Sequence, residues 1–215
     1  MAYLNLPIAL TWLRIVLIPL FVGVFYLPDS LLGMPAKDWL GMSIFALAAF
    51  TDWADGYLAR KWGQTSAFGA FLDPVADKLM VAAALIVLVW LRRADLWLAI
   101  IIIGREIAVS ALREWMAHLG RAKSVAVAFV GKVKTGAQIT AIIALLLDQP
   151  VIPGIDTHRL GTIALWVAAI LTLWSMFHYL RLAAPHLRAT TSTITPSPPQ
   201  SASGPVEARG ADPLD

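Results

Sequence analysis

Four aspartates lie between two strongly apolar stretches of this sequence. They are Asp52, Asp55, Asp73 and Asp77, in the segment DWADGYLARKWGQTSAFGAFLDPVADK, which follows MSIFALAAF and precedes LMVAAALIVLVWL. Ionisable side chains at membrane depth are costly unless they face a cavity or a partner, and they commonly mark functional sites. Simple pairing with neighbouring Lys and Arg would not require ordered spacing. The ordered spacing of these acids therefore indicates a site with chemistry.

The first two aspartates share a helical stripe with small residues and a cation. The stripe consists of Asp52, Asp55, Gly56, Ala59 and Arg60. Their i, i+3, i+4, i+7, i+8 pattern covers an arc of roughly 140° on a helix. The small residues leave room for a bulky ligand, and an arginine at the end of the stripe suits a phosphate group.

The second pair follows the same logic on the next predicted helix. Gly69, Asp73 and Asp77 are spaced four residues apart, and Pro74 follows the first of the two acids. The proline either kinks this helix or begins it, with Asp73 as the N-cap. In both cases the two carboxylates face the same partner.

Four carboxylates that converge repel one another unless a cation lies between them. A divalent ion removes this conflict, and hard oxygen ligands favour Mg²⁺ or Mn²⁺ over metals that prefer softer ligands. The sequence therefore predicts a metal site beside a phosphate-binding surface. A diphosphate substrate with a lipid part fits this combination.

The composition places these residues in a membrane protein. The 215-residue chain is 59% hydrophobic and 14% charged, whereas soluble domains are about half apolar and a quarter charged. It has no cysteine, which excludes disulfides and thiol chemistry. The net charge of +3 is small and does not indicate nucleic-acid binding.

Six segments have the length of a membrane-spanning helix, about 20 residues. They are Leu6–Pro28, Trp39–Arg60, Gly69–Leu91, Leu96–Met116, Val125–Leu147 and Leu160–Leu182. The first contains Arg14 and lacks a small-residue cleavage site, so we interpret it as a span and not a signal peptide. We predict an all-α polytopic membrane domain over residues 1–188. Residues 189–215, rich in Pro, Ser, Thr and Gly, are predicted to form a disordered cytoplasmic tail.

The distribution of Lys and Arg predicts that both termini are cytoplasmic. With this orientation, nine basic residues near helix ends lie inside and four outside, as positive-inside topology favours. The inside set is Arg60, Lys61, Arg113, Arg121, Lys123, Lys132, Lys134, Arg181 and Arg188; the outside set is Lys37, Arg92, Arg93 and Arg159. The adjacent Arg92 and Arg93 fit this scheme least well. The aspartates then lie toward the cytoplasmic end of their helices.

The spacing D-x2-D-G-x2-A-R-x8-G-x3-D-x3-D, complete from Asp52 to Asp77, resembles the signature of the CDP-alcohol phosphatidyltransferases. The segments NLPIALTWLRIVLIPLFVGVFYLP, GREIAVSALREWMAHLG and VAVAFVGKVKTGAQ resemble the branch of that family that forms phosphatidylglycerol phosphate. The resemblance covers residues 5–182. It departs from the family at Ile8, where many relatives have a polar residue.

The resemblance implies transfer of a phosphatidyl group from CDP-diacylglycerol to sn-glycerol 3-phosphate, with release of CMP. It implies Asp52, Asp55 and Asp73 as metal ligands, and Asp77 as the general base that also touches a second metal. The implied contacts of the cytidine diphosphate are Gly56, Ala59, Arg60, Gly69 and, in the first helix, Thr11. It further implies a homodimer among membrane lipids, in a bacterial plasma membrane, with the site facing the cytoplasm.

An acceptor that carries a phosphate needs cations of its own. The candidates are Arg105, Arg113, Lys132 and Lys134. Arg105 lies in the apolar run AIIIIGREIAV, where a cation is expensive unless it is used, although a simple pair with Glu106 is the alternative. The two lysines are about 200° apart on a helix, so the choice between them stays open. For Arg113, a role in topology alone is the alternative.

Three other functions remain as alternatives. Another acceptor is possible within the family: serine, inositol phosphate or phosphatidylglycerol. Serine has no phosphate and would not require Arg105 or Lys132. A membrane prenyltransferase also uses paired aspartates with Mg²⁺, but six helices are too few for that group. A transporter or ion channel with an acidic relay is the third alternative. Transporters usually show internal repeats, and none is visible here.

Overall fold

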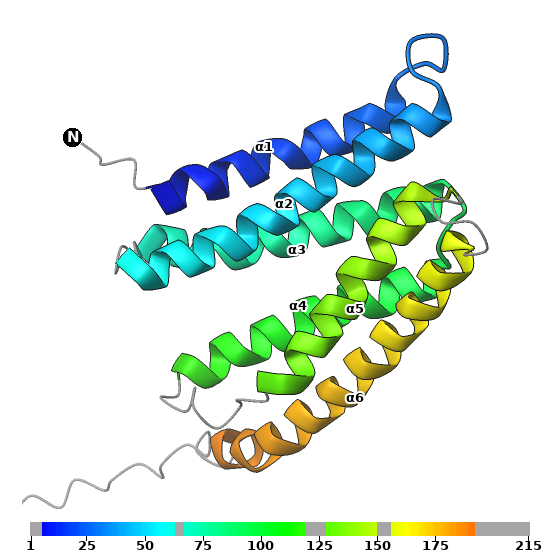
Figure 1. Ribbon diagram of the computed structural model, residues 1–215. Coiled ribbons are helices and arrows are strands. Elements are labelled where there is room, and N and C mark those ends of the chain that lie inside the picture. The colour runs from blue at the N-terminus through cyan, green and yellow to red at the C-terminus, as the bar shows by residue number, and fades with distance from the viewer. Residues whose placement is uncertain (1–5, 63–66, 119–127, 150–155, 192–215) are drawn as a thin grey trace, which may run out of the picture.

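The apolar stretches of the sequence form helices. The computed structural model describes residues 6–62, 67–118, 128–149 and 156–191, and all regular structure within these ranges is α-helical. The helices are α1 (Leu6–Tyr26), α2 (Met34–Trp62), α3 (Ala67–Trp90), α4 (Leu96–His118), α5 (Ala128–Leu147) and α6 (Thr157–Thr191) (Figure 1). The prediction of an all-α fold is confirmed.

Local signals explain where several helices begin. The carboxylate of Asp95 accepts a hydrogen bond from the backbone N–H of Trp97 (3.0 Å), and Asp156 accepts one from Arg159 (3.1 Å). These are N-cap contacts at the starts of α4 and α6. Pro74, in contrast, lies inside α3, which already begins at Ala67. The alternative in which Asp73 caps the start of this helix is therefore wrong. Membrane helices tolerate such a proline because neighbouring groups satisfy the freed carbonyl.

The helices run alternately up and down, so that α1 begins and α6 ends at the same end of the bundle (Figure 1). α1 packs on α2 and α3, whereas α6 packs on α4 and α5. α2 and α3 also contact α5, and α3 contacts α4. The two helices that carry the aspartates therefore lie between α1 and the other three.

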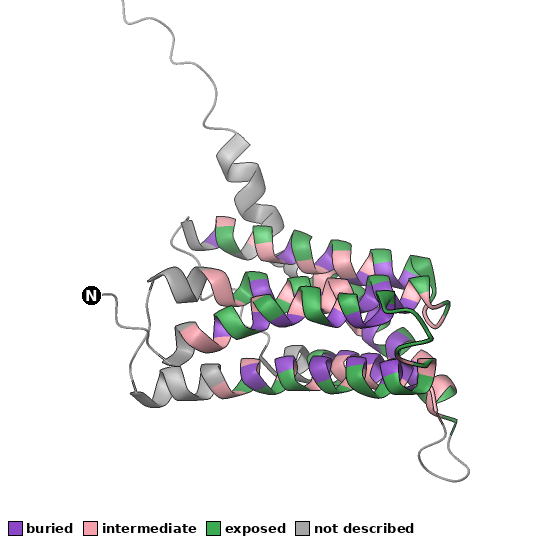
Figure 2. Ribbon diagram, turned by 90° about the horizontal axis from the view of Figure 1, so that it is seen from above, coloured by how far each residue is buried: buried purple, intermediate pink, exposed green. Residues whose placement is uncertain are grey.

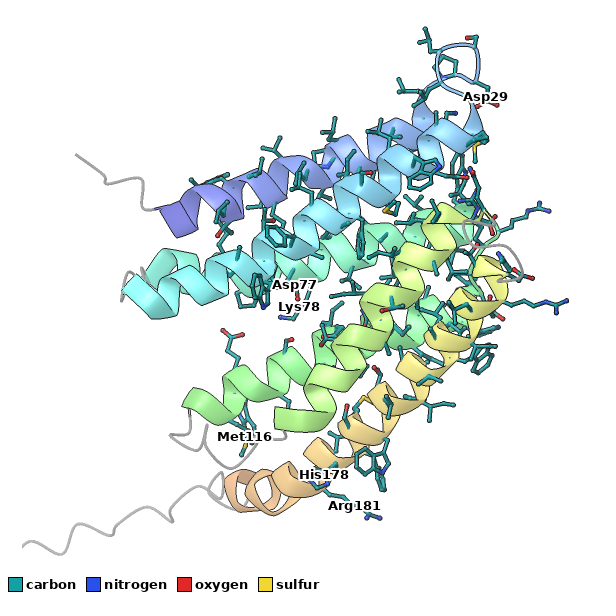
Figure 3. All side chains as sticks on the ribbon, viewed as in Figure 1. Asp29, Asp77, Lys78, Met116, His178 and Arg181 are labelled. Atoms are coloured by element: carbon teal, nitrogen blue, oxygen red, sulfur yellow. The ribbon has the colours of Figure 1, made fainter. Side chains whose placement is uncertain are left out.

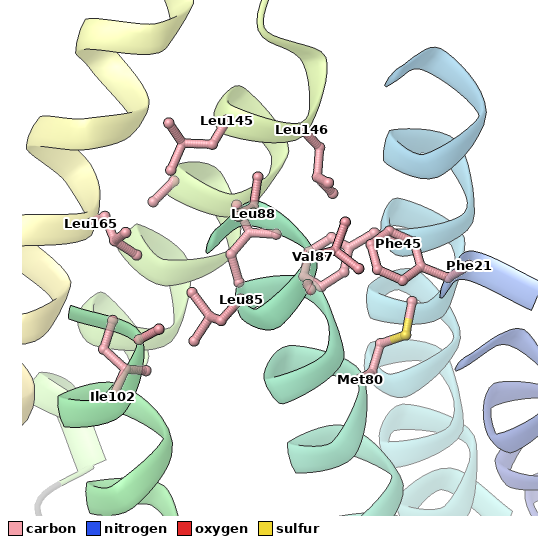
Figure 4. Packing of buried hydrophobic residues seen from close by; sticks show 14 of the residues in the cluster. Phe21, Phe45, Met80, Leu85, Val87, Leu88, Ile102, Leu145, Leu146 and Leu165 are labelled. Carbon is pink, nitrogen blue, oxygen red and sulfur yellow. The ribbon is translucent and has the colours of Figure 1, made fainter. Parts of the chain in front are cut away.

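The core is apolar and closely packed. Phe21, Phe45, Leu85 and Ile102 are among its fully buried side chains (Figure 4). Glycines permit close approach of neighbouring helices. A Cβ on Gly41 would lie 2.5 Å from the Phe25 ring, and one on Gly161 would lie 2.7 Å from Leu145.

Large apolar side chains are also exposed on the outside of the bundle. They include Trp12, Val16, Ile86, Ile163 and Ile170, whose exposed fractions lie between 49% and 63%. Figure 2 shows exposed residues along the outer faces of the helices. Exposed apolar surface on this scale marks contact with another apolar phase, such as lipid.

Two stretches of the described chain are long and apolar enough to cross a membrane, Ala9–Tyr26 and Thr157–His178. α2 and α3 carry several charged residues, which lowers their hydropathy. The side chains of α4 and α5 are described only in part. Six spans and the orientation of the termini therefore stay predictions. α6 extends to Thr191, beyond the predicted domain boundary at residue 188, and residues 192–215 lie outside the described part.

Arg93, which fits the predicted charge distribution poorly, pairs with two acids that are distant in the sequence. Its guanidinium binds Asp38 of α2 through two nitrogens (2.8 and 3.0 Å) and pairs with Asp148, just after α5 (3.0 Å). It also donates to the carbonyl of Leu146 (2.9 Å). This outer-end clamp, defined by Arg93, Asp38 and Asp148, joins α2, the α3–α4 turn and the end of α5.

Candidate active site

A buried cation from α1 reaches the first aspartate. Arg14 Nη1 lies 2.8 Å from a carboxylate oxygen of Asp52, and the arginine side chain is 1% exposed, against 43% for the acid. The two residues form an ion pair between α1 and α2. Because the arginine is enclosed by protein and the acid is not, the pair fixes Asp52 in orientation while leaving part of its carboxylate accessible.

Thr11 makes the equivalent connection to α3. Its hydroxyl donates a hydrogen bond to Asp73 Oδ1, and the threonine is buried. Thr11 lies one helical turn before Arg14, so both polar residues project from one side of α1. α1 thus orients one carboxylate on each of the two aspartate-bearing helices.

Asp52 and Asp77 line the same cavity, which measures about 60 Å³. Arg14 and Thr135 are the other polar residues in its wall, and the apolar part includes Phe45 and Met80 of the same two helices. Figure 3 shows Asp77 and Lys78 between α3 and the α4–α5 pair. The convergence of the two acidic stripes, predicted from spacing, is therefore observed for Asp52 and Asp77.

A second polar cluster joins α4, α5 and α6. One oxygen of Glu106 accepts from both Arg105 Nη1 (3.0 Å) and Lys134 Nζ. Arg105 Nη2 donates to Ser175 Oγ (2.6 Å), and Ser175 donates to the carbonyl of Thr172 (3.0 Å). We call Arg105, Glu106, Lys134 and Ser175 the cation cluster.

The cation cluster adjoins the cavity. Lys134 directly precedes Thr135, which lines the cavity wall, and Glu106 is close enough to Asp77 to interact with it electrostatically. Both cations are buried, at 6% exposure for Arg105 and 5% for Lys134. Two buried cations share the single acid Glu106, so the cluster keeps a net positive charge, which is the kind of environment that suits an anionic ligand.

The side chains present suit a divalent cation in chemical type. Carboxylates on α2 and α3 supply hard oxygen donors, and Asp52 interacts electrostatically with Asp73 and Asp77. Among the described side chains, no three potential ligands already lie close enough together to hold a metal. Asp55 is not among those side chains, and in this arrangement Arg14 and Thr11 occupy one oxygen each of Asp52 and Asp73.

The structure brings together part of the predicted site. Thr11, Asp52, Asp73, Asp77, Arg105 and Lys134 lie as described above. The side chains of seven other candidates lie outside the described part: Asp55, Gly56, Ala59 and Arg60 on α2, Gly69 on α3, Arg113 on α4 and Lys132 on α5. Thr11 donates a hydrogen bond to Asp73, and its contact with the cytidine diphosphate stays a prediction.

Sequence reasoning missed three residues. Arg14 interrupts an apolar segment just as Arg105 does, and that signal was sufficient to mark it as a partner of an acid. Glu106 was considered only as an ordinary partner of Arg105, and Ser175 carried no signal in one sequence. Both are visible only once α4, α5 and α6 are packed together.

Comparison with known proteins identifies the family. Residues 4–174 match the CDP-alcohol phosphatidyltransferase family. The chain is 52% identical over 187 residues to the CDP-diacylglycerol–glycerol-3-phosphate 3-phosphatidyltransferase of Sodalis glossinidius, covering 84% of this chain and 95% of the relative. The protein of the same name from Pectobacterium atrosepticum is 52% identical over 183 residues, covering 83% and 94%. The one from Salmonella typhimurium is 50% identical over 182 residues, with the same coverage. This chain belongs to the CDP-alcohol phosphatidyltransferase family.

Proposed function

We propose that this protein transfers the phosphatidyl group of CDP-diacylglycerol to sn-glycerol 3-phosphate, giving phosphatidylglycerol phosphate and CMP. The names of relatives that are about half identical over most of the chain support this activity. The observation in the structure that carries the choice of acceptor is the pair of buried cations beside the acidic cavity. An acceptor with its own phosphate requires such cations, whereas serine does not.

In the proposed reaction, Asp77 accepts the proton of the acceptor hydroxyl. The hydroxyl oxygen attacks the phosphatidyl phosphorus, a new P–O bond forms, and the bond from that phosphorus to the oxygen of CMP breaks. CMP leaves with the electron pair of the broken bond. Asp77 is suited to this role because it lines the cavity from α3, on the side that faces α4 and α5.

Asp52, Asp55 and Asp73 are proposed to hold Mg²⁺ or Mn²⁺. When bound, a divalent cation neutralises the charge that develops on the diphosphate. Arg14 and Thr11 orient Asp52 and Asp73 from α1. Gly56, Ala59, Arg60 and Gly69 are proposed to surround the cytidine diphosphate, with room left by the small residues and charge supplied by the arginine.

Arg105 and Lys134 are proposed to bind the phosphate of the acceptor. Lys134 directly precedes Thr135 of the cavity wall, and Glu106, which contacts both cations, interacts electrostatically with Asp77. Binding there would direct the hydroxyl end of glycerol 3-phosphate toward the cavity. Arg113 and Lys132 remain proposed contributors on the same two helices.

We further propose that the protein spans a bacterial plasma membrane as a homodimer, with the site at the cytoplasmic face. The start of α1 and the end of α6 share one end of the bundle, and the four aspartates lie in the halves of α2 and α3 nearer to that end. The excess of Lys and Arg at that end supports its cytoplasmic location.

The test is an acceptor panel with the purified full chain and CDP-diacylglycerol, scored by release of CMP. Glycerol 3-phosphate is compared with glycerol, serine, inositol phosphate and phosphatidylglycerol, each with Mg²⁺, with Mn²⁺ and with excess chelator. We expect release with glycerol 3-phosphate and a divalent cation only. Preference for serine would overturn the acceptor assignment, and full activity in chelator would overturn the metal assignment.

A further inference from the structure

We infer that Glu106 is a positioning residue that joins Arg105 and Lys134 into one site for the acceptor phosphate. This inference rests on the proposed function. Its basis is that a single oxygen of Glu106 contacts cations from two different helices, α4 and α5. No direct contact between substrate and Glu106 is needed for this role.

The contacts of Arg105 leave donors for a ligand. A guanidinium has five N–H groups, and the hydrogen bonds to Glu106 and Ser175 use Nη1 and Nη2. Among the described residues, the buried Nε has no hydrogen-bond partner. Arg105 therefore keeps N–H groups that neither Glu106 nor Ser175 uses. Ser175 is itself anchored to the carbonyl of Thr172, so the orientation of the guanidinium is fixed from both sides.

Charge explains why an acid belongs between the two cations. Arg105 and Lys134 are both buried and would repel each other if they were brought together without an anion. Glu106 removes this repulsion and leaves the three side chains with a net charge of about +1. The cluster therefore still attracts a phosphate dianion, but it is preorganised before the substrate arrives.

The position of Glu106 distinguishes it from an ordinary ion-pair partner. It interacts electrostatically with Asp77 and with Lys78, the two α3 residues that face α4 and α5. Its carboxylate is partly accessible, at 22% exposure, whereas the two cations are nearly enclosed. Glu106 thus contacts both proposed phosphate ligands and also interacts electrostatically with the proposed general base.

The experiment compares steady-state kinetics of wild type, Glu106→Gln and Ser175→Ala. The glutamine keeps the size of the side chain and removes its charge. We expect KM for glycerol 3-phosphate to rise about 10-fold in Glu106→Gln, the scale of one lost charge-assisted hydrogen bond, with KM for CDP-diacylglycerol unchanged. Ser175→Ala should raise the same KM about 3-fold, because it removes one anchor of the Arg105 guanidinium and leaves the contact with Glu106 in place. Glu114→Gln, the same change on an exposed residue of α4, is the matched control.

Three results would overturn the inference. A lower KM for glycerol 3-phosphate in Glu106→Gln would mean that Glu106 blocks the phosphate site. An equal rise in both KM values, together with a lower thermal midpoint, would mean a structural ion pair only. If Glu106→Gln does not fold, an unchanged KM in Ser175→Ala overturns it. Failure of the proposed function would appear differently, as absence of CMP release with glycerol 3-phosphate in the wild type.

Discussion

Arg14 of α1 forms an ion pair of 2.8 Å with Asp52 of α2, although the arginine side chain is only 1% exposed. A cation buried among apolar helices is costly, so its partner matters. Since Asp52 begins the family motif, this pair connects the first helix to the proposed metal site. Thr11, one turn earlier on α1, makes a second connection to that site by donating a hydrogen bond to Asp73 of α3.

Arg14→Met should reduce activity without reducing thermal stability. Methionine fills similar apolar space, and Asp52 remains partly solvated after the loss of its partner, so we expect a thermal midpoint close to wild type. The turnover number should fall about 10- to 100-fold, because a misplaced ligand carboxylate no longer orients the reacting groups. CMP release and thermal unfolding check the two expectations. Arg159→Met, at an exposed arginine that also pairs with an acid, is the control. Unchanged turnover in Arg14→Met would show that the pair does not support catalysis.

Asp77→Asn should reduce turnover by about 10²-fold or more, the scale of a lost general base. Binding of CDP-diacylglycerol should stay nearly intact, because asparagine keeps the shape of the side chain and the three other aspartates remain. A nucleotide-binding assay beside the kinetic assay checks both parts. Asp95→Asn, in which asparagine still caps α4, should match wild type. Loss of nucleotide binding in Asp77→Asn would instead identify Asp77 mainly as a metal ligand.

Arg93→Met should destabilise the protein without altering catalysis. Asp38, with a side chain 5% exposed, would be left buried without its main cation, which costs about 3–5 kcal/mol when one partner of a buried pair is removed. The expected decrease in the thermal midpoint is roughly 10 °C. Asp38 lies 14 residues before Asp52 on α2, about 21 Å along the helix, so KM values should not change.

Two further variants sharpen the Arg93 experiment. Arg93→Met combined with Asp38→Asn should recover part of the lost stability, because the unpaired buried charge is gone. Arg92→Met, at the exposed neighbouring arginine, should behave like wild type. If the single Arg93 variant is as stable as wild type, the outer-end clamp contributes nothing measurable.

The sequence predicts the helices well because apolar length is a local property. All six expected segments correspond to helices, with boundaries that differ by five residues or fewer, except that α6 ends at Thr191 and not at the predicted Leu182. It also predicts that Asp52 and Asp77 converge, because helical spacing sets which residues share a face and adjacent helices bring the faces together. The start of α3 was ambiguous, since Pro74 is compatible with both a first turn and a helix interior.

What the sequence does not contain is the rotation of each helix against its neighbours. Lys132 and Lys134 are about 200° apart around a helix axis, and only the packing of α4 and α5 against α6 places Lys134 next to Glu106. The partner of Arg14 could not be assigned for the same reason. Arg93 was an exception to the predicted distribution of Lys and Arg. It pairs with Asp38 and Asp148, two acids that are distant in the sequence, and no pattern in the sequence indicates these pairs.

A substitution of Arg105 tests most directly how the phosphate of the acceptor is bound. Arg105 is 6% exposed and is held by Glu106 at 3.0 Å and by Ser175 at 2.6 Å. A guanidinium so fixed can bind a phosphate through more than one N–H without further loss of side-chain freedom. Lys134 supplies a second charge but no planar fork, so its loss should have the smaller effect.

Arg105→Ala should therefore raise KM for glycerol 3-phosphate by roughly 30- to 150-fold, which corresponds to about 2–3 kcal/mol for a hydrogen-bonded charge. KM for CDP-diacylglycerol should change little, because its diphosphate is proposed to lie against the aspartates. Lys134→Ala should act in the same direction but more weakly, and Arg159→Ala should have no effect. The measurement is steady-state CMP release with each substrate varied in turn. An equal loss for both substrates in Arg105→Ala would mean that Arg105, Glu106 and Ser175 only hold α4 against α6. In that case the acceptor phosphate would have to be bound by Arg113 or Lys132.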